Sequence, residues 1–306
     1  MPVYCCSSLT EPFKRLGIPY IFYDVRQDDL NGDIDSIIEQ IHKYKPDSLL
    51  AVSMYGNPCE LDKLEDLCKN HKIKLIDDAA QSFGAEVNGK KVGYFGDAGF
   101  ISFSPGKPLA AHMGGLFRVD IDYKIDRTNH PVLHKLLYSE FLKNRCEGFG
   151  KKSGKLRKKT VHYMQTHINI ANDGIEEFEE GVLMGVFRNS DLLWTPFRTE
   201  LAHMMVKEVS NNNAFSFIEP YSDNYRKGIA HKYVIKVRDK GEAIRLNHYL
   251  HDNQISSQFG YSLLTKDLQD FPNAKRIDGC IIEIPLDPDM DSYKYIKYML
   301  NNYYSE

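Results

Sequence analysis

No stretch of this sequence is long and apolar enough to cross a membrane, and neither sign of charge is in marked excess. A membrane-spanning helix needs about 20 consecutive apolar residues, and no run in the chain approaches that length. The 306 residues carry a formal net charge of only −3. Proteins that bind nucleic acid or anionic membranes usually carry a large basic excess, so we predict neither kind of partner.

Cysteine motifs are missing as well. The chain shows no Cys-x-x-Cys pair and no zinc-like spacing of cysteine with histidine. Its six cysteines are Cys5, Cys6, Cys59, Cys68, Cys146 and Cys280. Free thiols are typical of a reducing compartment. The first residues also lack the basic region and long apolar region of a signal peptide. These features favour a cytoplasmic protein.

What is present is the composition of an ordinary globular protein, with 42% apolar and 26% charged residues. In the first third of the chain, short apolar segments alternate with segments of helical periodicity. Strands are predicted at 3–6, 20–23, 49–54, 73–76 and 99–103, and helices at 9–16, 34–44 and 61–70. Asp33 is the expected cap of the second helix. Alternation of this kind predicts an α/β fold with a mainly parallel sheet flanked by helices.

The rest of the chain predicts a second, smaller unit. We expect strands at 233–237, 255–259 and 280–284, with helices at 192–209, 240–251 and 292–303. The predicted organisation is a large domain at 1–186 and a linking helix with a small C-terminal α/β domain at 187–306. The large domain would include a helical and basic insertion at about 121–183. Within it, the basic run at 150–159 is interpreted as a solvated loop, with a phosphate-rich ligand as the alternative.

Polar side chains follow two of the predicted strands. Asp78 and Gln81 come after the apolar run at 73–76, and Ser102 and Lys107 lie at or beyond the end of the run at 99–103. Ligands of open α/β sheets bind beyond the carboxyl ends of the strands. We therefore expect these four side chains to meet at one edge of the sheet.

Pyridoxal phosphate requires this set of groups. A lysine forms a Schiff base with the cofactor and moves the substrate proton, and a carboxylate keeps the pyridine nitrogen protonated. Hydroxyl groups hold the phosphate, and a further polar group fixes the ring oxygen O3′. We predict Lys107, Asp78, Ser102 and Gln81 for these roles, in that order. The alternative is a surface lysine and solvated aspartates in ordinary loops.

Asp77 is the less favoured carboxylate. It is adjacent to Asp78, and neighbouring side chains of a strand point to opposite faces of the sheet. Only one of the two can therefore face the ligand edge.

These segments resemble the DegT/DnrJ/EryC1/StrS sugar aminotransferase family, a branch of the fold-type I enzymes that use pyridoxal phosphate. The matching motifs agree in order, spacing and residue type. They are Tyr55-Gly56-Asn57-Pro58, Ile76-Asp77-Asp78-Ala79-Ala80-Gln81-Ser82-Phe83-Gly84-Ala85, Gly89-Lys90-Lys91-Val92-Gly93-Tyr94-Phe95-Gly96-Asp97-Ala98, Ser102-Phe103-Ser104-Pro105-Gly106-Lys107-Pro108 and Gly114-Gly115.

The resemblance implies an activity and partners. The reaction would be amino transfer, commonly from glutamate, to a keto sugar carried on a nucleotide, in surface polysaccharide or amino-sugar biosynthesis. The working unit would be a homodimer with shared active sites. The segment Phe187-Arg188-Asn189-Ser190 resembles the one whose arginine, here Arg188, or a neighbouring asparagine would reach the cofactor phosphate of the partner subunit.

The sequence also departs from the family pattern. The usual N-terminal segment with a Ser-Gly-Thr-like turn is expected to be absent, and Cys6 stands where relatives place an aromatic ring over the cofactor. A catalytically impaired or truncated paralogue that keeps the fold is therefore an alternative. A dehydratase branch of the family replaces the Schiff-base lysine with histidine. Lys107 is intact, which favours amino transfer over the dehydratase alternative.

Overall fold

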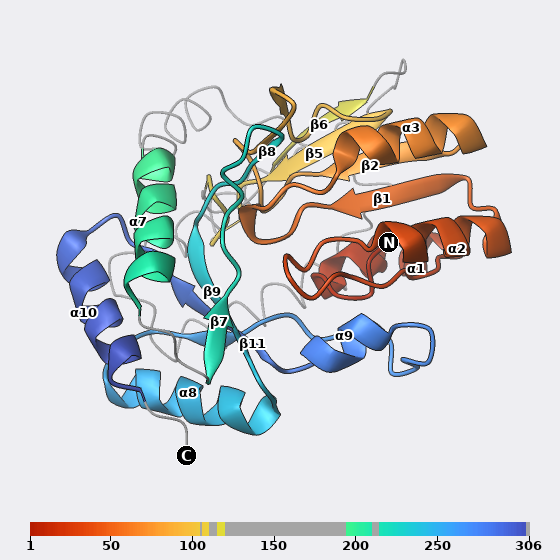
Figure 1. The fold of residues 1–306 in the computed structure, drawn as a ribbon. Coiled ribbons are helices and arrows are strands. Elements are labelled where there is room, and N and C mark those ends of the chain that lie inside the picture. The colour runs from red at the N-terminus through yellow and green to blue at the C-terminus, as the bar shows by residue number, and fades with distance from the viewer. Residues whose placement is uncertain (105, 110–114, 120–193, 210–213, 304–306) are drawn as a thin grey trace, which may run out of the picture.

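The computed structural model describes residues 1–104, 106–109, 115–119, 194–209 and 214–303. These residues form two four-stranded sheets with their helices, which lie side by side in Figure 1, and one small three-stranded sheet. Among the helices in these ranges, none combines the length and the apolar character needed to cross a bilayer.

The first sheet has the strand order β1-β2-β5-β6. Its members are β1 (Ser48–Val52), β2 (Lys74–Asp78), β5 (Ala98–Ser102) and β6 (Gly115–Val119). β1, β2 and β5 are parallel, whereas β6 runs antiparallel to β5. The first three strands therefore end at the same edge of the sheet.

Helices of the first half of the chain pack on both faces of this sheet. They are the 3-10 helix η1 (Ser7–Thr10) and the α-helices α1 (Glu11–Leu16), α2 (Ile34–Tyr44) and α3 (Leu61–His71). The Asp33 side chain accepts a hydrogen bond from the Ser36 N–H at 3.1 Å, which confirms the predicted cap of α2. Apolar side chains of α2 and α3 share one core cluster with Leu49, Ala51 and Leu75.

The opposite face of the first sheet forms a different cluster. Leu50 and Val52 alternate with Leu49 and Ala51 along β1, and they point to the other side. There they pack against residues from both ends of the chain. These include Met1, Val3, Tyr4, Val234, Ala274, Ile277 and Ile281. This cluster joins the two sheets into one structure.

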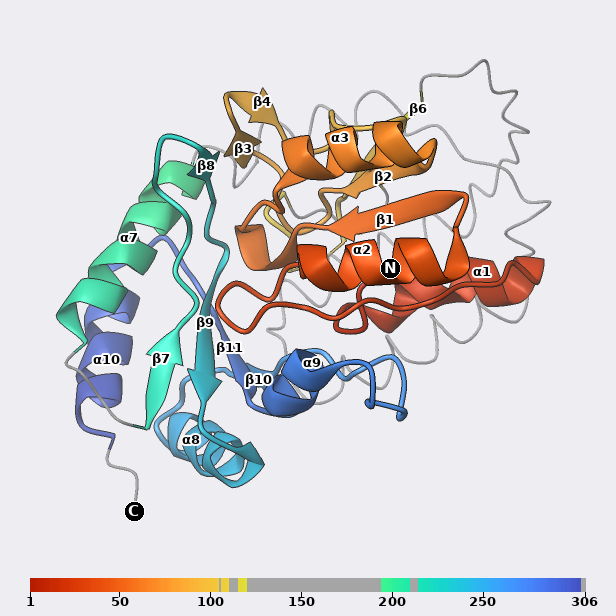
Figure 2. The same cartoon turned by 45° about the vertical axis from the view of Figure 1, so that its right-hand side comes forward.

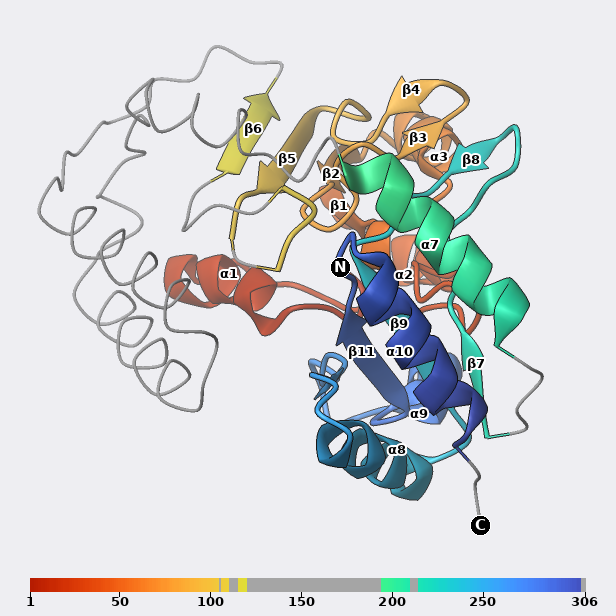
Figure 3. The ribbon, with the colours of Figure 1, turned by 90° about the vertical axis from the view of Figure 1, so that its left-hand side faces the viewer.

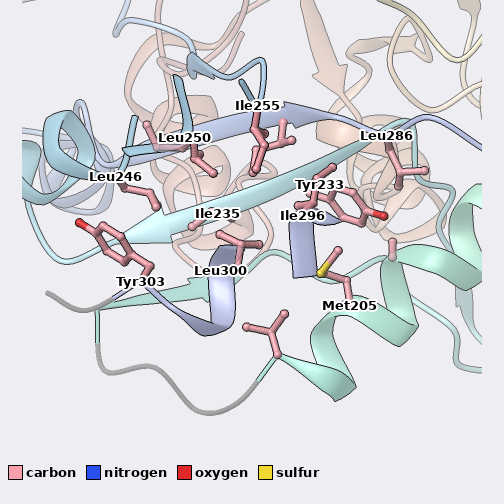
Figure 4. Packing of buried hydrophobic residues seen from close by; sticks show 14 of the residues in the cluster. Met205, Tyr233, Ile235, Leu246, Leu250, Ile255, Leu286, Ile296, Leu300 and Tyr303 are labelled. Carbon is pink, nitrogen blue, oxygen red and sulfur yellow. The ribbon is translucent and has the colours of Figure 1, made fainter. Parts of the chain in front are cut away.

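The second sheet is antiparallel, in the order β10-β11-β9-β7. Its strands are β7 (Phe215–Phe217), β9 (Lys232–Val237), β10 (Gln258–Phe259) and β11 (Ile281–Pro285). The helices are α7 (Thr195–Glu208), α8 (Lys240–Asp252), α9 (Pro272–Ile277) and α10 (Met290–Asn301). Figure 3 shows α7 alongside α10, and Figure 4 shows Tyr233 and Ile235 of β9 packed among side chains of α8 and α10.

A third, small sheet ties the two halves of the chain together. β3 (Glu86–Val87) pairs with β4 (Lys90–Lys91) on one side and with β8 (Arg226–Lys227) on the other. Figure 2 shows β8 reaching across to β3. β8, which follows α7 in the sequence, thus adds a third strand to the hairpin of β3 and β4.

The predicted elements are mostly confirmed, with differences at the chain start. The strands expected at 3–6 and 20–23 are wrong. The pairing there consists of single bridges, Pro2 with Tyr23 and Tyr4 with Leu263, because this segment runs between the two halves instead of along one partner strand. The strand expected at 255–259 shortens to β10. The predicted domain boundary at 186 and the insertion at 121–183 lie outside the described residues.

A close backbone approach at Gly56 predicts a matched pair of stability effects. Gly56 has a φ of +92°, and a Cβ built on it would lie 1.9 Å from the carbonyl oxygen of Ile229. Gly89 has a similar φ of +76°, but a Cβ there meets no described atom within 4 Å. Left-handed strain of about 1–2 kcal/mol applies to both positions. We expect Gly56→Ala to cost at least about 2 kcal/mol more than Gly89→Ala, because only the first forces the backbones apart.

Urea unfolding of both variants checks this expectation. Equal losses of unfolding free energy would show that the contact between Gly56 and Ile229 is not tightly packed in solution.

Candidate functional site

The candidate site lies where the parallel strands of the first sheet end. Val52 at the end of β1 pairs with Asp78 at the end of β2, and Asp78 pairs with Phe100 of β5. The predicted residues Asp78, Gln81, Ser102 and Lys107 follow from these strand ends.

Asp78 is a buried carboxylate that forms one side-chain hydrogen bond within the part of the chain that the structure describes. Its side chain is 3% exposed, and Oδ1 accepts a hydrogen bond from the Ala80 N–H at 2.8 Å. Burial raises the pKa of Asp78 to about 6, against the opposing effects of the Ala80 N–H and the Lys107 charge. The group is therefore mainly ionised at neutral pH, as a partner for a protonated ring nitrogen must be.

Asp77 has a structural role, and its side chain binds backbone N–H groups of the loop before β5. Its Oδ2 accepts hydrogen bonds from the Gly93 N–H at 2.5 Å and the Phe95 N–H at 3.2 Å, so it fixes the loop before β5. Burial raises the pKa of Asp77 to about 7. The two adjacent carboxylates thus have different neighbours, as the alternation of a strand requires.

Lys107 is half-buried close to Asp78. Burial lowers the pKa of its ammonium group, while the negative charges of Asp78 and Glu283 act in the opposite direction. A lowered pKa increases the fraction of neutral amine, which is the nucleophilic form. Lys107 thus has the environment expected of a lysine that attacks a carbonyl group.

Gln81 and Ser102 lie between Asp78 and Lys107 in the sequence. Gln81 is 3% exposed; its Oε1 accepts from the Tyr55 N–H at 3.4 Å, and its Nε2 approaches the Met54 sulfur at 3.5 Å. The Ser102 hydroxyl donates to the Ser104 hydroxyl at 3.2 Å and accepts from the Ser104 N–H at 3.3 Å. Two hydroxyl groups therefore lie together at the end of β5.

Residues of the second half of the chain also reach this region, and sequence reasoning missed them. The ring nitrogens of His231 are buried and have no hydrogen-bond partner among the described residues. Burial lowers the pKa of His231 well below its usual value, and the charges of Lys232, Lys107 and Arg198 lower it further. A cluster of three cations around a neutral imidazole is suited to a ligand that carries negative charge.

Glu283 is the second missed group. It is 2% exposed in β11 and forms an ion pair with Lys232. One signal was present in the sequence, since a charged residue interrupts the apolar run Ile281-Ile282-Glu283-Ile284. Charged residues are rarely fully buried unless they are paired.

Arg188 and Gly114, both part of the predicted motifs, fall outside the described residues. The role assigned to Arg188 remains a prediction. The arginine that the structure does place near the site is Arg198 of α7, whose charge acts on His231.

Comparison with known proteins gives a match over nearly the whole chain. The model of the DegT/DnrJ/EryC1/StrS aminotransferase family matches residues 2–299. GDP-perosamine synthase of Vibrio cholerae is 32% identical over 127 residues, which cover 42% of this chain and 34% of that protein. The erythromycin biosynthesis sensory transduction protein EryC1 of Saccharopolyspora erythraea is 26% identical over 266 residues, covering 83% and 64% of the two chains. The match to the first of these relatives thus spans about a third of its length.

Solved structures show the same fold. A DegT DnrJ EryC1 StrS aminotransferase from Brucella abortus superposes with a TM-score of 0.71 at 17% identity, over 100% of this chain and 79% of that one. The aminotransferase TlmJ from Streptoalloteichus hindustanus gives a TM-score of 0.72 at 16% identity, over 98% and 77%. The fold is that of fold-type I enzymes, as predicted. Together with the family match, this establishes that the chain belongs to the DegT/DnrJ/EryC1/StrS aminotransferase family.

Proposed function

We propose that this protein is a pyridoxal phosphate-dependent aminotransferase that transfers an amino group, with glutamate as the donor, to a keto sugar carried on a nucleotide. The observation that carries the proposal is the pairing of the buried Asp78 at the end of β2 with the half-buried Lys107 beyond the end of β5, with the pKa of the lysine lowered by burial. Several relatives support the substrate class by name, including GDP-perosamine synthase and a UDP-linked altrosamine transaminase of Campylobacter jejuni.

The residues present fit pyridoxal phosphate. The site supplies a carboxylate, an amide, hydroxyl groups and an amine, and two buried nitrogens of His231 are left without a protein partner among the described residues. Orphaned buried polar atoms are uncommon in folded proteins. Their presence beside Lys107 supports a polar ligand at this position.

Each residue would have a separate task. Bound pyridoxal phosphate would supply an electron sink for the substrate carbon. Asp78 would keep a proton on the pyridine nitrogen, and Gln81 would orient the ring oxygen. Ser102 would contribute to phosphate binding, and Lys107 would hold the cofactor and later move a proton at its Nζ.

The partners follow from the same proposal. The positive charges of Lys232 and Arg198 near His231 suit the negative charges of a carboxylate donor or a nucleotide-linked sugar. We further propose a cytoplasmic homodimer in which Arg188 of one chain serves the cofactor phosphate of the other.

Lys107 should be required for the visible absorption band of the bound cofactor. We expect purified protein to gain this band when pyridoxal phosphate is added, and Lys107→Ala to abolish it. Borohydride reduction followed by peptide mass spectrometry should place the cofactor on Lys107 in the native protein. Lys240→Ala is the matched control, because Lys240 is ion-paired with Asp278 on the surface of the second half. Identical spectra for native protein and Lys107→Ala would overturn the assignment.

Asp77 and Asp78 should differ in their effects on the pH dependence of stability and on activity. The pKa of Asp77 is raised from 3.8 to about 7, so the folded protein binds more protons than the unfolded chain in that window, and its stability falls as the pH rises. Asp77→Asn should remove a slope of up to about 1.4 kcal/mol per pH unit in the cofactor-free protein. Between pH 6 and pH 7 most of this slope should come from Asp77, because Asp78, whose pKa is raised only to about 6, has lost a larger share of its protons in that window.

The activity should depend on Asp78 and not on Asp77. We expect Asp78→Asn to slow amino transfer by at least about 100-fold, while Asp77→Asn retains the cofactor band and most of the activity. Urea unfolding between pH 5 and pH 8 and steady-state rates measure the two effects. A loss of activity in Asp77→Asn with none in Asp78→Asn would reverse the assignment of the carboxylates.

A further inference from the structure

A buried carboxylate of the second sheet binds the turn that follows β1. Glu283 of β11 accepts hydrogen bonds from the Tyr55 hydroxyl at 2.7 Å, the Lys232 ammonium at 2.5 Å and the Gln258 amide at 2.6 Å. Lys232 and Gln258 come from β9 and β10, the two neighbours of β11. Tyr55 instead belongs to the 3-10 turn η2 (Met54–Gly56) at the ligand edge of the first sheet. Glu283 therefore joins its own sheet to that turn.

The hydrogen bonds around the Tyr55 ring have a defined direction. Because the Tyr55 hydroxyl donates to Glu283, its oxygen is left to accept from the Tyr4 hydroxyl at 2.9 Å. The Tyr4 oxygen in turn accepts from the Tyr261 N–H at 3.2 Å. Burial raises the pKa of Tyr4 and Tyr55 above their usual values, so both phenols keep their protons. The ring of Tyr55 is thus fixed through its hydroxyl from two sides.

The backbone of the same turn contacts Gln81. Tyr55 has φ 54° and ψ 24°, a left-handed conformation that costs energy for a residue with a side chain. In this conformation its N–H lies 3.4 Å from Gln81 Oε1, and the sulfur of Met54 lies 3.5 Å from Gln81 Nε2. Both contacts are long. They depend on the turn being held in place by other interactions.

We propose that Glu283 is a positioning residue for the candidate cofactor site, and that it acts through the Tyr55 turn on Gln81. Glu283 holds the Tyr55 ring, the ring holds the left-handed turn, and the turn holds both polar ends of the Gln81 amide. The inference rests on the proposed function, in which Gln81 orients the ring oxygen of pyridoxal phosphate.

Two double variants isolate the acceptor at position 283. Glu283→Leu/Lys232→Met and Glu283→Gln/Lys232→Met both remove the ion pair, so neither leaves a buried charge without its partner. Only the glutamine variant retains an oxygen that can accept from the Tyr55 hydroxyl. We expect the leucine variant to accelerate hydrogen exchange of the peptide that covers residues 54–57 about tenfold in the cofactor-free protein. Its dissociation constant for pyridoxal phosphate should rise by a similar factor, and the glutamine variant should restore both values toward the native ones.

Glu242 provides a matched control within the second half of the chain. Its carboxylate is 0% exposed and accepts hydrogen bonds from the Tyr303 hydroxyl and from Arg245. Arg245 lies in α8 and Tyr303 follows α10, so neither partner belongs to the Tyr55 turn. Glu242→Leu should therefore destabilise the protein without changing exchange at residues 54–57 or the affinity for the cofactor.

The outcomes separate the two proposals. Unchanged exchange at the turn in Glu283→Leu/Lys232→Met would overturn the positioning role, whatever the cofactor does. Faster exchange with unchanged affinity would also overturn it, because the turn would then not control the site. Equal defects in the leucine and glutamine variants would show that charge, and not the acceptor for Tyr55, is what matters. Native protein that fails to bind pyridoxal phosphate would overturn the proposed function, and the role of Gln81 with it.

Discussion

The hydrogen-bonded turn at Tyr55, Gly56 and Asn57 is the interaction on which the rest of the structure depends. Tyr55 bonds to Glu283, the Gly56 carbonyl accepts from the Ile229 N–H at 3.0 Å, and the Asn57 side chain bonds to the backbone of Glu219 and Tyr221 at 2.9 Å. Three consecutive residues of the first half thus bind the second half. Since the turn follows β1, these bonds place the second sheet directly over the ligand edge of the first.

This arrangement explains how one site receives groups from distant parts of the sequence. The parallel strands supply Asp78 and Lys107, whereas His231 and Lys232 arrive on the segment that docks at Gly56. Burial at this junction raises the pKa of Asp78 and lowers the pKa of Lys107. The same desolvation that makes such a junction costly increases the neutral, nucleophilic fraction of the Lys107 amine, while Asp78 stays mainly ionised at neutral pH.

Much of this structure could be predicted from local patterns. Helices α2 and α3 follow from their apolar spacing, and the parallel strands follow from continuous apolar runs bounded by polar residues. The motif around Asp78 and Lys107 was visible because strand ends of a parallel sheet meet at one edge. The junction was not predictable, because the bond between Tyr55 and Glu283 spans 228 residues and no local period marks it. The segment around Val3 was likewise expected to be a strand, because its apolar residues do not reveal how distant its partners are. It forms single bridges to partners in both halves of the chain.

The donor half of the reaction tests the proposed amino transfer by Asp78 and Lys107 without knowledge of the sugar. Protein loaded with pyridoxal phosphate is mixed with glutamate in the absence of any keto sugar, and the 2-oxoglutarate released is measured. We expect one equivalent of 2-oxoglutarate for each bound cofactor, in a single turnover. Cofactor bound at Lys107 with no release of 2-oxoglutarate would contradict the proposed amino transfer.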